Sequence, residues 1–518
     1  SGEHGIGITK MKFLEKQKRK ELREYREQVD PAGMMNPGML EDPAIINKVF
    51  TPSFNLLELE ARILKHGYLE TLSAKIAKCV RCGKCKPDCC VFIPAGNVYF
   101  HPRNKNLAIG SLIEALLYDM QRSHFPRFKQ LKNLQEIADH CTMCGKCFGP
   151  CPVDIDTAEV SVLEREILAE VGYKKKPIAT SMSLYYLKTR NSLFNSIFRK
   201  GVVDWGGKMQ RLGVKVLQKA PKALAEDGNK LVEMFRSPMV PPSPKTLRHI
   251  LPQCANSEAL LVHPANAAVK TVFYFPGCGS ERLYANIGMA ALYILLKSNI
   301  QVVLPPPHLC CGFPSKVNAK KKAHNEIVLR DTIIFSQIRE MLGHIKFDAV
   351  VISCGTCREA LNNIGCEAIF ECNLNDISSY ALSQDLKLEK VSGNYLYHAP
   401  CHDSLKGEGK NLIENLGLTV ETISNCCSEA GTLAISRPDI ASAMRLKKRE
   451  TISRVAKDDS AEIRILTNCP SCISGLGRNV DMSVKPQHFA EMLADSLGGD
   501  DWQKELETLL QRAEKVTF

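Results

Sequence analysis

Hydrophobic and polar positions follow different patterns before and after about residue 268. In the earlier part, apolar residues recur three and four positions apart, which is typical of helices packed on one face. The pattern predicts helices over residues 10–29, 108–118 and 131–138, and a helical connector from Val160 to about Pro252. In the first helix, one buried stripe is predicted from Leu14, Leu22, Tyr25 and Val29.

Beyond residue 268, short apolar runs alternate with helical segments. The runs predict strands at residues 271–275, 301–304, 347–352, 394–397, 419–423 and 464–466. Helical periodicity between them, over residues 283–297 and 328–342 for example, favours βαβ-type units with parallel sheets. The sequence therefore predicts a multidomain α+β and α/β protein, with a helical part followed by two βαβ-type units.

Length and composition narrow the class of protein. The chain has 518 residues, of which 44% are hydrophobic and 24% charged, so a disordered or collagen-like chain is excluded. The longest apolar run, Ala290 to Leu296, is far shorter than the ~20 residues of a membrane span. The first residue is Ser1, inside a motif, so we expect a fragment of a longer polypeptide. A net charge of +12 comes from scattered clusters without interleaved aromatic residues, which predicts no nucleic-acid partner.

The cysteine content is the unusual feature of the composition. There are 22 cysteines, and they recur as CxxC and CC clusters rather than as scattered partners. This arrangement favours metal or iron–sulfur chemistry in a reducing compartment over a secreted disulfide framework. We therefore expect a cytoplasmic protein, or one peripheral on the inner face of the cytoplasmic membrane, to which the basic segment Lys10 to Arg26 would contribute.

Two cysteine motifs have the 2-2-3 spacing of bacterial-type ferredoxins, in which the fourth cysteine of each motif serves the other cluster. One [4Fe–4S] cluster is predicted on Cys79, Cys82, Cys85 and Cys151. The other is predicted on Cys141, Cys144, Cys147 and Cys89. Two alternatives stay open: Cys90 in place of Cys89, and structural zinc in place of iron.

A second cysteine pattern occurs twice in the C-terminal part, each time as a single Cys, a CC pair and a CxxC at predicted strand ends. The first set is Cys278, Cys310, Cys311, Cys354 and Cys357. The second set is Cys401, Cys426, Cys427, Cys469 and Cys472. Because parallel strands end at one edge of a sheet, each set is predicted to meet at one rim and bind a metal or cluster. His308 and His402 lie beside these cysteines and are expected to be polar surface residues rather than ligands.

This repeat resembles the CCG domain, which occurs twice in the cysteine-rich component of heterodisulfide reductases and in the iron–sulfur subunits of glycolate oxidase and lactate-utilisation proteins. The resemblance implies further iron–sulfur clusters, non-cubane in heterodisulfide reductases and electron relays in the dehydrogenase subunits. Zinc or an ordinary cubane stays open for either set. The first half keeps Cys-Cys-Gly, whereas the second reads Cys426-Cys427-Ser428 and lacks the glycine.

The opening residues carry another motif. Ser-Gly-Glu-His-Gly-Ile-Gly, a helix and then Asp-Pro-Ala-Gly-Met-Met-Asn-Pro-Gly resemble the C-terminal end of FAD-linked oxidases such as D-lactate and glycolate dehydrogenases. The resemblance implies that His4 is the base for the substrate hydroxyl, that Glu3 binds a divalent metal, and that Asn36 lies near FAD. Gly5 and Gly7 allow the backbone to approach a flat ligand. The segments that hold FAD in that family lie upstream, so this chain alone is expected to be inactive.

The expected organisation is the end of an FAD-linked oxidase domain (1–45), a ferredoxin domain (46–160), a helical connector with a Pro-rich linker (161–268), two CCG domains (269–390 and 391–500) and a C-terminal helix (501–518). The expected function is the iron–sulfur part of a flavin-dependent D-2-hydroxy-acid dehydrogenase, which passes electrons from FAD to a quinone or another carrier. The expected partners are the upstream FAD-binding part and a small 2-hydroxy acid. The alternatives are a thiol–disulfide oxidoreductase with catalytic CCG clusters and a zinc-stabilised scaffold.

Overall fold

The computed structural model describes most of the chain in two compact units, residues 1–175 and 176–518. The ranges it leaves undescribed are residues 1–10, 12–13, 36–57, 59–60, 63–66, 93–99, 124–131, 133, 175–176, 220–229, 385, 387, 390, 392–394, 430–431 and 457–461. Among the described residues, every helix is too short or too polar to cross a lipid bilayer.

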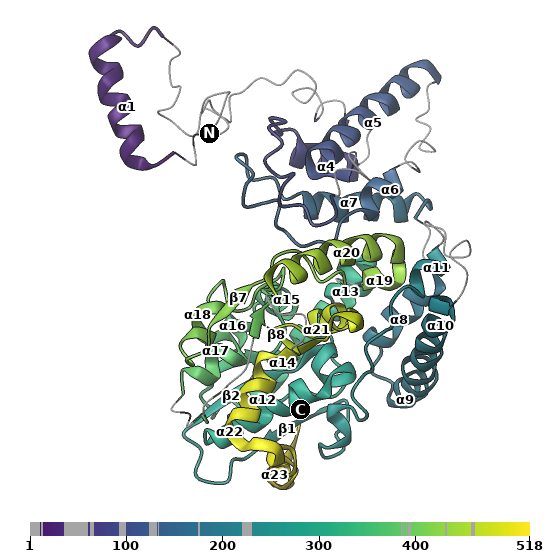
Figure 1. The fold of residues 1–518 in the computed structure, drawn as a ribbon, viewed down its shortest axis with the longest axis vertical. Coiled ribbons are helices and arrows are strands. Elements are labelled where there is room, and N and C mark those ends of the chain that lie inside the picture. Colours follow the sequence, from purple (N-terminus) through teal and green to yellow (C-terminus); the bar gives the residue numbers. More distant parts are fainter. Residues whose placement is uncertain are drawn as a thin grey trace. The chain divides into compact units, whose positions relative to one another are not determined.

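The described part of the first unit is helical (Figure 1). Its elements are α1 (Lys16–Val29), α4 (Gly67–Ile76), α5 (Pro102–Ser123), α6 (Leu134–Asp139) and α7 (Thr157–Glu170). α4, α5, α6 and α7 pack around one small core that contains Leu72, Ile109, Ile113 and Val160. α7 begins at Asp156, whose carboxylate accepts hydrogen bonds from the backbone N–H groups of Ala158 and Glu159.

The predicted buried stripe of the first helix is wrong. α1 forms, but it buries no residue, and Leu22, Tyr25 and Val29 are exposed. Its side chains are mostly charged, so the three apolar residues stand apart on a polar surface and no described element covers them. The spacing predicted the helix, whereas burial depends on a packing partner that spacing does not supply.

The first residues of the predicted connector form α7 and lie in the N-terminal unit, whereas from residue 176 on the connector belongs to the same compact unit as the C-terminal part (Figure 1). Its helices are α8 (Ile178–Lys188), α9 (Ser192–Phe198), a π-helical turn η5 (Arg199–Gly206), α10 (Gly207–Lys219) and α11 (Lys230–Met234). The Pro-rich segment after α11 is held against them, because Arg199 donates a hydrogen bond to the carbonyl of Ser243 and the Met239 N–H donates to Gln210. It does not separate two compact units.

The first sheet contains, among the described residues, six strands in the order β10-β1-β3-β2-β4-β5. Their bounds are β1 (Glu258–Val262), β2 (Lys270–Phe275), β3 (Ile300–Leu304), β4 (Ala349–Ile352), β5 (Asn373–Asp376) and β10 (Ala513–Thr517). β3, β2, β4 and β5 are parallel, while β1 pairs antiparallel with both β3 and β10. The predicted parallel arrangement of this half is confirmed, with an antiparallel edge added.

The second sheet is parallel throughout its described strands and has the order β7-β6-β8-β9. The bounds are β6 (Tyr395–Tyr397), β7 (Val420–Thr422), β8 (Ile463–Thr467) and β9 (Val484–His488). Its order matches β3-β2-β4-β5 strand for strand, so the sequence repeat is also a repeat of topology. We call residues 269–390 the first half and residues 391–500 the second half.

Helices cover the sheets as βαβ units require. In the first half they are η8 (Gly279–Leu283), α12 (Ala285–Lys297), α13 (Phe313–Val317), α14 (Lys321–Met341), α15 (Gly355–Ile364), α16 (Cys366–Phe370) and α17 (Ile377–Leu382). In the second half they are α18 (Gly409–Glu414), α19 (Leu433–Ser436), α20 (Pro438–Val455), α21 (Pro470–Gly477) and α22 (Phe489–Gly498). α12 packs beside α22, and one continuous core includes residues of both halves (Figure 1).

Two sequence expectations need correction. The C-terminal segment is helical in α23 (Trp502–Leu509) and in a 3-10 turn, η12 (Leu510–Arg512), but its last residues form β10, because they pair with β1 across five residue positions. β1 lies within residues 161–268, the range assigned to the connector and its linker, where no strand was predicted. Both strands are short, and their pairing joins residues about 250 positions apart, which local periodicity does not detect.

Candidate metal centres

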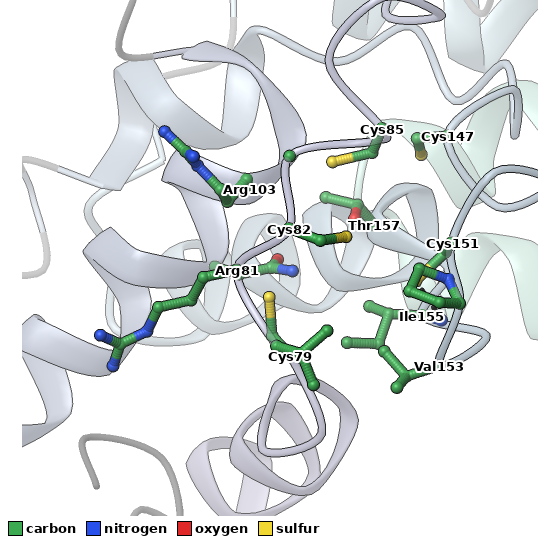
Figure 2. A pocket seen from close by; sticks show the side chains of 14 residues that line it. Cys79, Arg81, Cys82, Cys85, Arg103, Cys147, Cys151, Val153, Ile155 and Thr157 are labelled. Carbon is green, nitrogen blue, oxygen red and sulfur yellow. Dashed lines mark hydrogen bonds between the residues drawn. The ribbon is translucent and has the colours of Figure 1, made fainter. Parts of the chain in front are cut away.

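The first candidate centre is a small cavity in the N-terminal unit (Figure 2). Cys79, Cys82 and Cys85 reach it from the loop between α4 and α5, and Cys151 reaches it from the loop before α7. Cys147 also lines this cavity. The structure thus brings together the four cysteines predicted for one cluster, and their assignment as ligands stays a prediction.

The second ferredoxin motif gathers around Cys147. This thiol interacts electrostatically with Cys141, Cys144 and Cys89. Cys89 in turn interacts with Lys105 and Cys141. The neighbour Cys90 is buried, and its thiol points toward the carbonyl of Asp88, 4.0 Å away. Between Cys89 and Cys90, this geometry favours Cys89 as the fourth candidate ligand.

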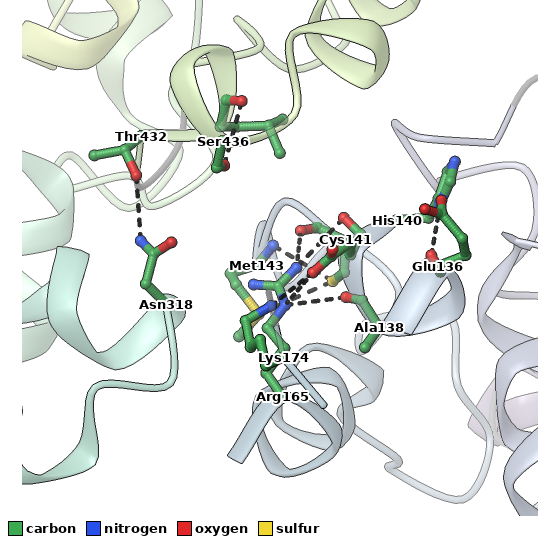
Figure 3. Close-up of polar contacts among 12 residues, drawn as sticks. Glu136, Ala138, His140, Cys141, Met143, Arg165, Lys174, Asn318, Thr432 and Ser436 are labelled. Carbon is green, nitrogen blue, oxygen red and sulfur yellow. Dashed lines mark hydrogen bonds and ion pairs between the residues drawn. The ribbon is translucent and has the colours of Figure 1, made fainter. Parts of the chain in front are cut away.

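A buried arginine fixes the loop that carries the second motif (Figure 3). Arg165 of α7 donates hydrogen bonds to the carbonyl oxygens of Ala138 (3.0 Å) and Cys141 (2.7 Å). Lys174 pairs with Asp139 in the same region at 2.8 Å. Fixed carbonyls hold the Cys141 loop in one conformation, so its thiols are preorganised for a bound group.

Burial controls the protonation of these thiols. It raises the pKa of Cys79 and Cys147, and raises the pKa of Cys85 to about 12. It also raises the pKa of Cys89, although the ammonium of Lys105 acts in the opposite direction. Without a cation such thiols keep their protons, whereas a metal or cluster binds thiolates and releases those protons. The donor set therefore fits a thiolate-bound iron–sulfur cluster.

In the first half, all five predicted cysteines meet at the carboxyl ends of β2, β3 and β4. The thiols of Cys278 and Cys311 lie within hydrogen-bonding reach of Cys310, and the Cys357 thiol lies within reach of Cys311 and Cys354. Hydrogen bonding from neighbouring thiols lowers the pKa of Cys310 and Cys354. Cys354 is also the N-cap residue of α15, where free backbone N–H groups favour a thiolate.

The second half repeats this arrangement. The Cys427 thiol lies within hydrogen-bonding reach of Cys426, and the Cys472 thiol lies within reach of Cys427 and Cys469. Cys469 is the N-cap residue of α21, as Cys354 is of α15. Cys401 follows the end of β6, at the position that Cys278 has after β2, and is less buried than the other four.

The two halves meet at these cysteines. The thiol of Cys469 donates a hydrogen bond to Cys354, so nine thiols form one continuous row across the junction. We call it the thiol row; in order of contact its members are Cys278, Cys310, Cys311, Cys357, Cys354, Cys469, Cys472, Cys427 and Cys426.

Two glycines make the junction close. A Cβ atom on Gly355 would lie 1.5 Å from the carbonyl oxygen of His402, and one on Gly279 would lie 2.7 Å from Pro470. Gly355 follows Cys354 and meets the residue after Cys401, while Gly279 follows Cys278 and meets the residue after Cys469. The contacts are therefore reciprocal, as across a two-fold axis.

Buried charges surround the first half of the thiol row. Burial acts to raise the pKa of Glu281, but Arg248, His308 and Arg282 hold it at about 2. Arg282 is fully buried and donates hydrogen bonds to the carbonyls of His308 and Tyr186. Its charge favours the thiolates of Cys278 and Cys310.

His308 and His402 sit in polar contacts rather than at the thiols. The His308 ring lies 3.4 Å from Glu281, and His402 pairs with Glu359 at 2.7 Å. Their side chains are partly rather than fully exposed, so the expectation of open surface positions holds only in part.

The second half has Ser428 where the first half has Gly312, but the turn after the CC pair keeps the same backbone conformation. Gly312 has a φ of +80°, and Ser428 takes the same left-handed conformation with a φ of +69°. The cysteines before it still gather with Cys472 and Cys469. The second half therefore keeps the thiol arrangement at the cost of strain in a residue with a Cβ atom.

The buried pair of His398 and Lys448 at this site was not predicted from the sequence. A ring nitrogen of His398 and the sulfurs of Cys427 and Cys472 all lie within 4.8 Å of one another, and all three residues are buried. Lys448 contacts the Nδ1 atom of His398 at 2.9 Å. Alignment of the two halves with each other would have found it, because His398 replaces a phenylalanine of the first half.

The predicted flavin-site residues lie outside the described residues. These are Glu3, His4, Gly5, Gly7 and Asn36. Their roles stay predictions.

Comparison with known families supports this organisation. Residues 75–155 match the 4Fe-4S dicluster domain, and residues 272–362 and 395–477 match the cysteine-rich CCG domain. Residues 1–40 match the C-terminal domain of FAD linked oxidases. The matched ranges coincide with the cavity, the two halves and the opening motif.

Individual relatives agree with the family matches. The probable glycolate oxidase iron-sulfur subunit of Bacillus subtilis is 22% identical over 85% of this chain and 98% of its own length. The glycolate oxidase iron-sulfur subunit of Escherichia coli is 22% identical over 81% of this chain and 93% of its own. One component of the fumarate reductase (CoM/CoB) of Methanothermobacter marburgensis is 27% identical over 38% of this chain, but the match spans only 40% of that protein.

Fold, thiol sites and family matches together define an iron–sulfur oxidoreductase, in which a 4Fe-4S dicluster domain precedes a doubled cysteine-rich CCG domain. Within that class the chain is similar to iron–sulfur subunits of glycolate oxidase and to lactate utilization proteins, and its opening residues match the C-terminal domain of FAD linked oxidases.

The neighbouring residues Cys89 and Cys90 provide a test of the ligand assignment. Cys89→Ser should remove about four irons per chain, the content of one [4Fe–4S] cluster, because its thiol lies with Cys141 and Cys147. Cys90→Ser is the matched control and should leave the iron content unchanged. Iron and acid-labile sulfide analysis of anaerobically purified protein measures both, and the opposite result would assign Cys90 as the ligand.

Proposed function

We propose that this chain is the electron-transfer portion of a flavin-dependent dehydrogenase of D-2-hydroxy acids, such as D-lactate, glycolate or D-2-hydroxyglutarate. The observation that carries the proposal is the combination, in one polypeptide, of a flavin-oxidase segment, a two-motif thiol cavity and the thiol row. Several relatives are named as iron–sulfur subunits of glycolate oxidase or as lactate utilization proteins.

In this proposal the chain's cysteines hold the redox groups. Cys79, Cys82, Cys85 and Cys151 bind one cluster, while Cys141, Cys144, Cys147 and Cys89 bind the other. The two halves of the thiol row, with Cys401, bind further clusters. Bound clusters of this kind accept one electron at a time, which matches a flavin that is reduced by two electrons.

The opening residues would act at the flavin. His4 would accept the hydroxyl proton of the substrate, Glu3 would bind a divalent metal, and Gly5, Gly7 and Asn36 would lie against FAD. The FAD-binding part is proposed to lie upstream in the same polypeptide. A quinone or another carrier is the proposed final acceptor.

Exposed apolar and basic side chains of the connector support the proposed peripheral membrane location, in addition to the basic helix α1. Trp205, Met209, Leu212 and Val216 are four, three and four positions apart along η5 and α10, so they share one face, and all are exposed. Residues 178–219 contain eight lysines and arginines against one aspartate. An exposed apolar stripe with a tryptophan and surrounding basic side chains fits the interface of an anionic bilayer.

A thiol–disulfide oxidoreductase is the second candidate. It is favoured by the contact between Cys354 and Cys469, which places both halves of the thiol row at one junction. The fusion to an FAD-linked oxidase segment favours the dehydrogenase.

Substrate-driven reduction tests the proposed function. The longer polypeptide that includes the proposed upstream FAD-binding part, mixed anaerobically with D-lactate, glycolate or D-2-hydroxyglutarate, should develop the electron paramagnetic resonance (EPR) signals of reduced [4Fe–4S] clusters. Cys144→Ser should remove one of these signals. Oxidation of the reduced protein by a small disulfide, with no reduction by any of the three acids, would contradict the dehydrogenase and favour the second candidate.

Vesicle binding tests the membrane location. The chain should sediment with phosphatidylglycerol-containing vesicles and less with neutral phosphatidylcholine vesicles. Trp205→Ser combined with Leu212→Ser should weaken binding about tenfold or more, because both side chains would enter the interface. Val480→Ser, which changes an exposed apolar residue elsewhere, is the control. Equal binding by all three proteins, or self-association through the stripe without lipid binding, would contradict the location.

A further inference from the structure

The two halves differ at one pair of equivalent buried positions. Tyr274 of β2 and Tyr397 of β6 match, because each hydroxyl hydrogen-bonds the residue before a CxxC motif, Ser353 at 3.1 Å and Asn468 at 3.2 Å. The residues after these tyrosines are therefore also equivalent. They are Phe275 in the first half and His398 in the second, each three positions before a single cysteine.

The helix facing these residues differs in the same way. In the first half, Phe275 packs against Phe335 of α14, with ring centroids 5.9 Å apart. In the second half, His398 contacts Lys448 of α20 at 2.9 Å. Both pairs are buried to at least 99%. An apolar aromatic pair in one half is thus replaced by a histidine and a lysine in the other.

Burial of a lysine is costly unless its ammonium group has partners. Lys448 Nζ lies 3.3, 2.5 and 3.3 Å from the carbonyl oxygens of Ile423, Ser424 and Asn425. These three carbonyls immediately precede Cys426. With the His398 ring nitrogen at 2.9 Å, the ammonium has four acceptors for its three N–H groups, so the two carbonyls at 3.3 Å share one N–H, and Ser424 and His398 receive one each.

The contact with Lys448 determines which tautomer His398 adopts. Because an ammonium can only donate, Nδ1 of His398 must be the acceptor of the 2.9 Å contact. A neutral imidazole that accepts at Nδ1 carries its proton on Nε2. A metal-binding histidine has the opposite arrangement, with its second nitrogen donating to a carboxylate, carbonyl or water. His398 is therefore built as a hydrogen-bond donor rather than as a metal ligand.

We propose that Lys448 and His398 form a positioning pair that donates the Nε2–H hydrogen bond of His398 to the sulfurs of Cys427 and Cys472 and thereby raises the reduction potential of the cluster bound by the second half. The proposal rests on the proposed function, since it requires a cluster at these thiols. Hydrogen bonds to the sulfurs and nearby positive charge both stabilise the more negative, reduced state of an iron–sulfur cluster. The first half has no such donor at the equivalent position, because Phe275 occupies it.

The test is an EPR-monitored dithionite titration of the anaerobically purified chain and its variants. His398→Phe removes the proposed donor, and the double variant His398→Phe with Lys448→Phe recreates the aromatic pair of the first half. Both should lower the potential of one cluster by 59 mV or more, a tenfold change in its one-electron equilibrium. The signals of the ferredoxin clusters should not shift. His398→Gln, whose amide N–H can replace the Nε2–H donor, should stay closer to the wild type.

Three results would overturn the pair's role. One is an unchanged potential in His398→Phe at full iron content. Another is loss of iron in that variant together with a directly bonded nitrogen in the wild type by electron–nuclear double resonance, which would make His398 a ligand. The third is zinc in the second half of the wild type, which would remove the proposed cluster there but leave electron transfer by the ferredoxin unit standing. If the phenylalanine variants do not fold, the potential of His398→Gln and the double-resonance spectrum of the wild type decide.

Discussion

The carboxyl ends of parallel strands impose the constraint on which the C-terminal unit depends. In each half, β2, β3 and β4, or β6, β7 and β8, end at one edge, and a cysteine follows each strand within a few residues. The two edges face each other, so that Cys354 and Cys469 touch and the thiol row becomes continuous. Close approach requires the glycines Gly355 and Gly279, since a Cβ atom at either would collide with the opposite half. The edge of each sheet thus determines where the cysteines gather, and the two glycines determine how closely the two halves approach each other.

Burial then sets the chemistry of the gathered thiols. Desolvation raises the pKa of the ferredoxin-motif thiols Cys79, Cys85, Cys89 and Cys147, whereas hydrogen bonding from neighbouring thiols lowers the pKa of Cys310 and Cys354. Fixed cations and carbonyls surround the thiols, including Arg282 in the first half, Lys448 in the second and Arg165 beneath the ferredoxin loop. These groups are held by many partners, so they do not have to reorganise when a charged group binds.

Much of this arrangement could be predicted from the sequence, because cysteine spacing and strand alternation are local signals. All six predicted strands formed, and the parallel sheets were confirmed. The pairing of β1 with β10, the burial state of α1 and the contact between Cys354 and Cys469 were not predictable, because each depends on partners far away in the chain or on another surface. His398 could have been found by aligning the halves with each other, but its partner Lys448 lies 50 positions away, and only the fold brings them together.

The proposed electron transfer requires that the thiols of both units hold iron–sulfur clusters. The content of iron, zinc and acid-labile sulfide per chain in anaerobically purified protein, together with EPR after graded reduction, tests this requirement. We expect about twelve to sixteen irons, because two ferredoxin clusters bind about eight and the two halves of the thiol row bind the rest. Little iron together with several zincs would contradict it and identify a zinc-stabilised scaffold.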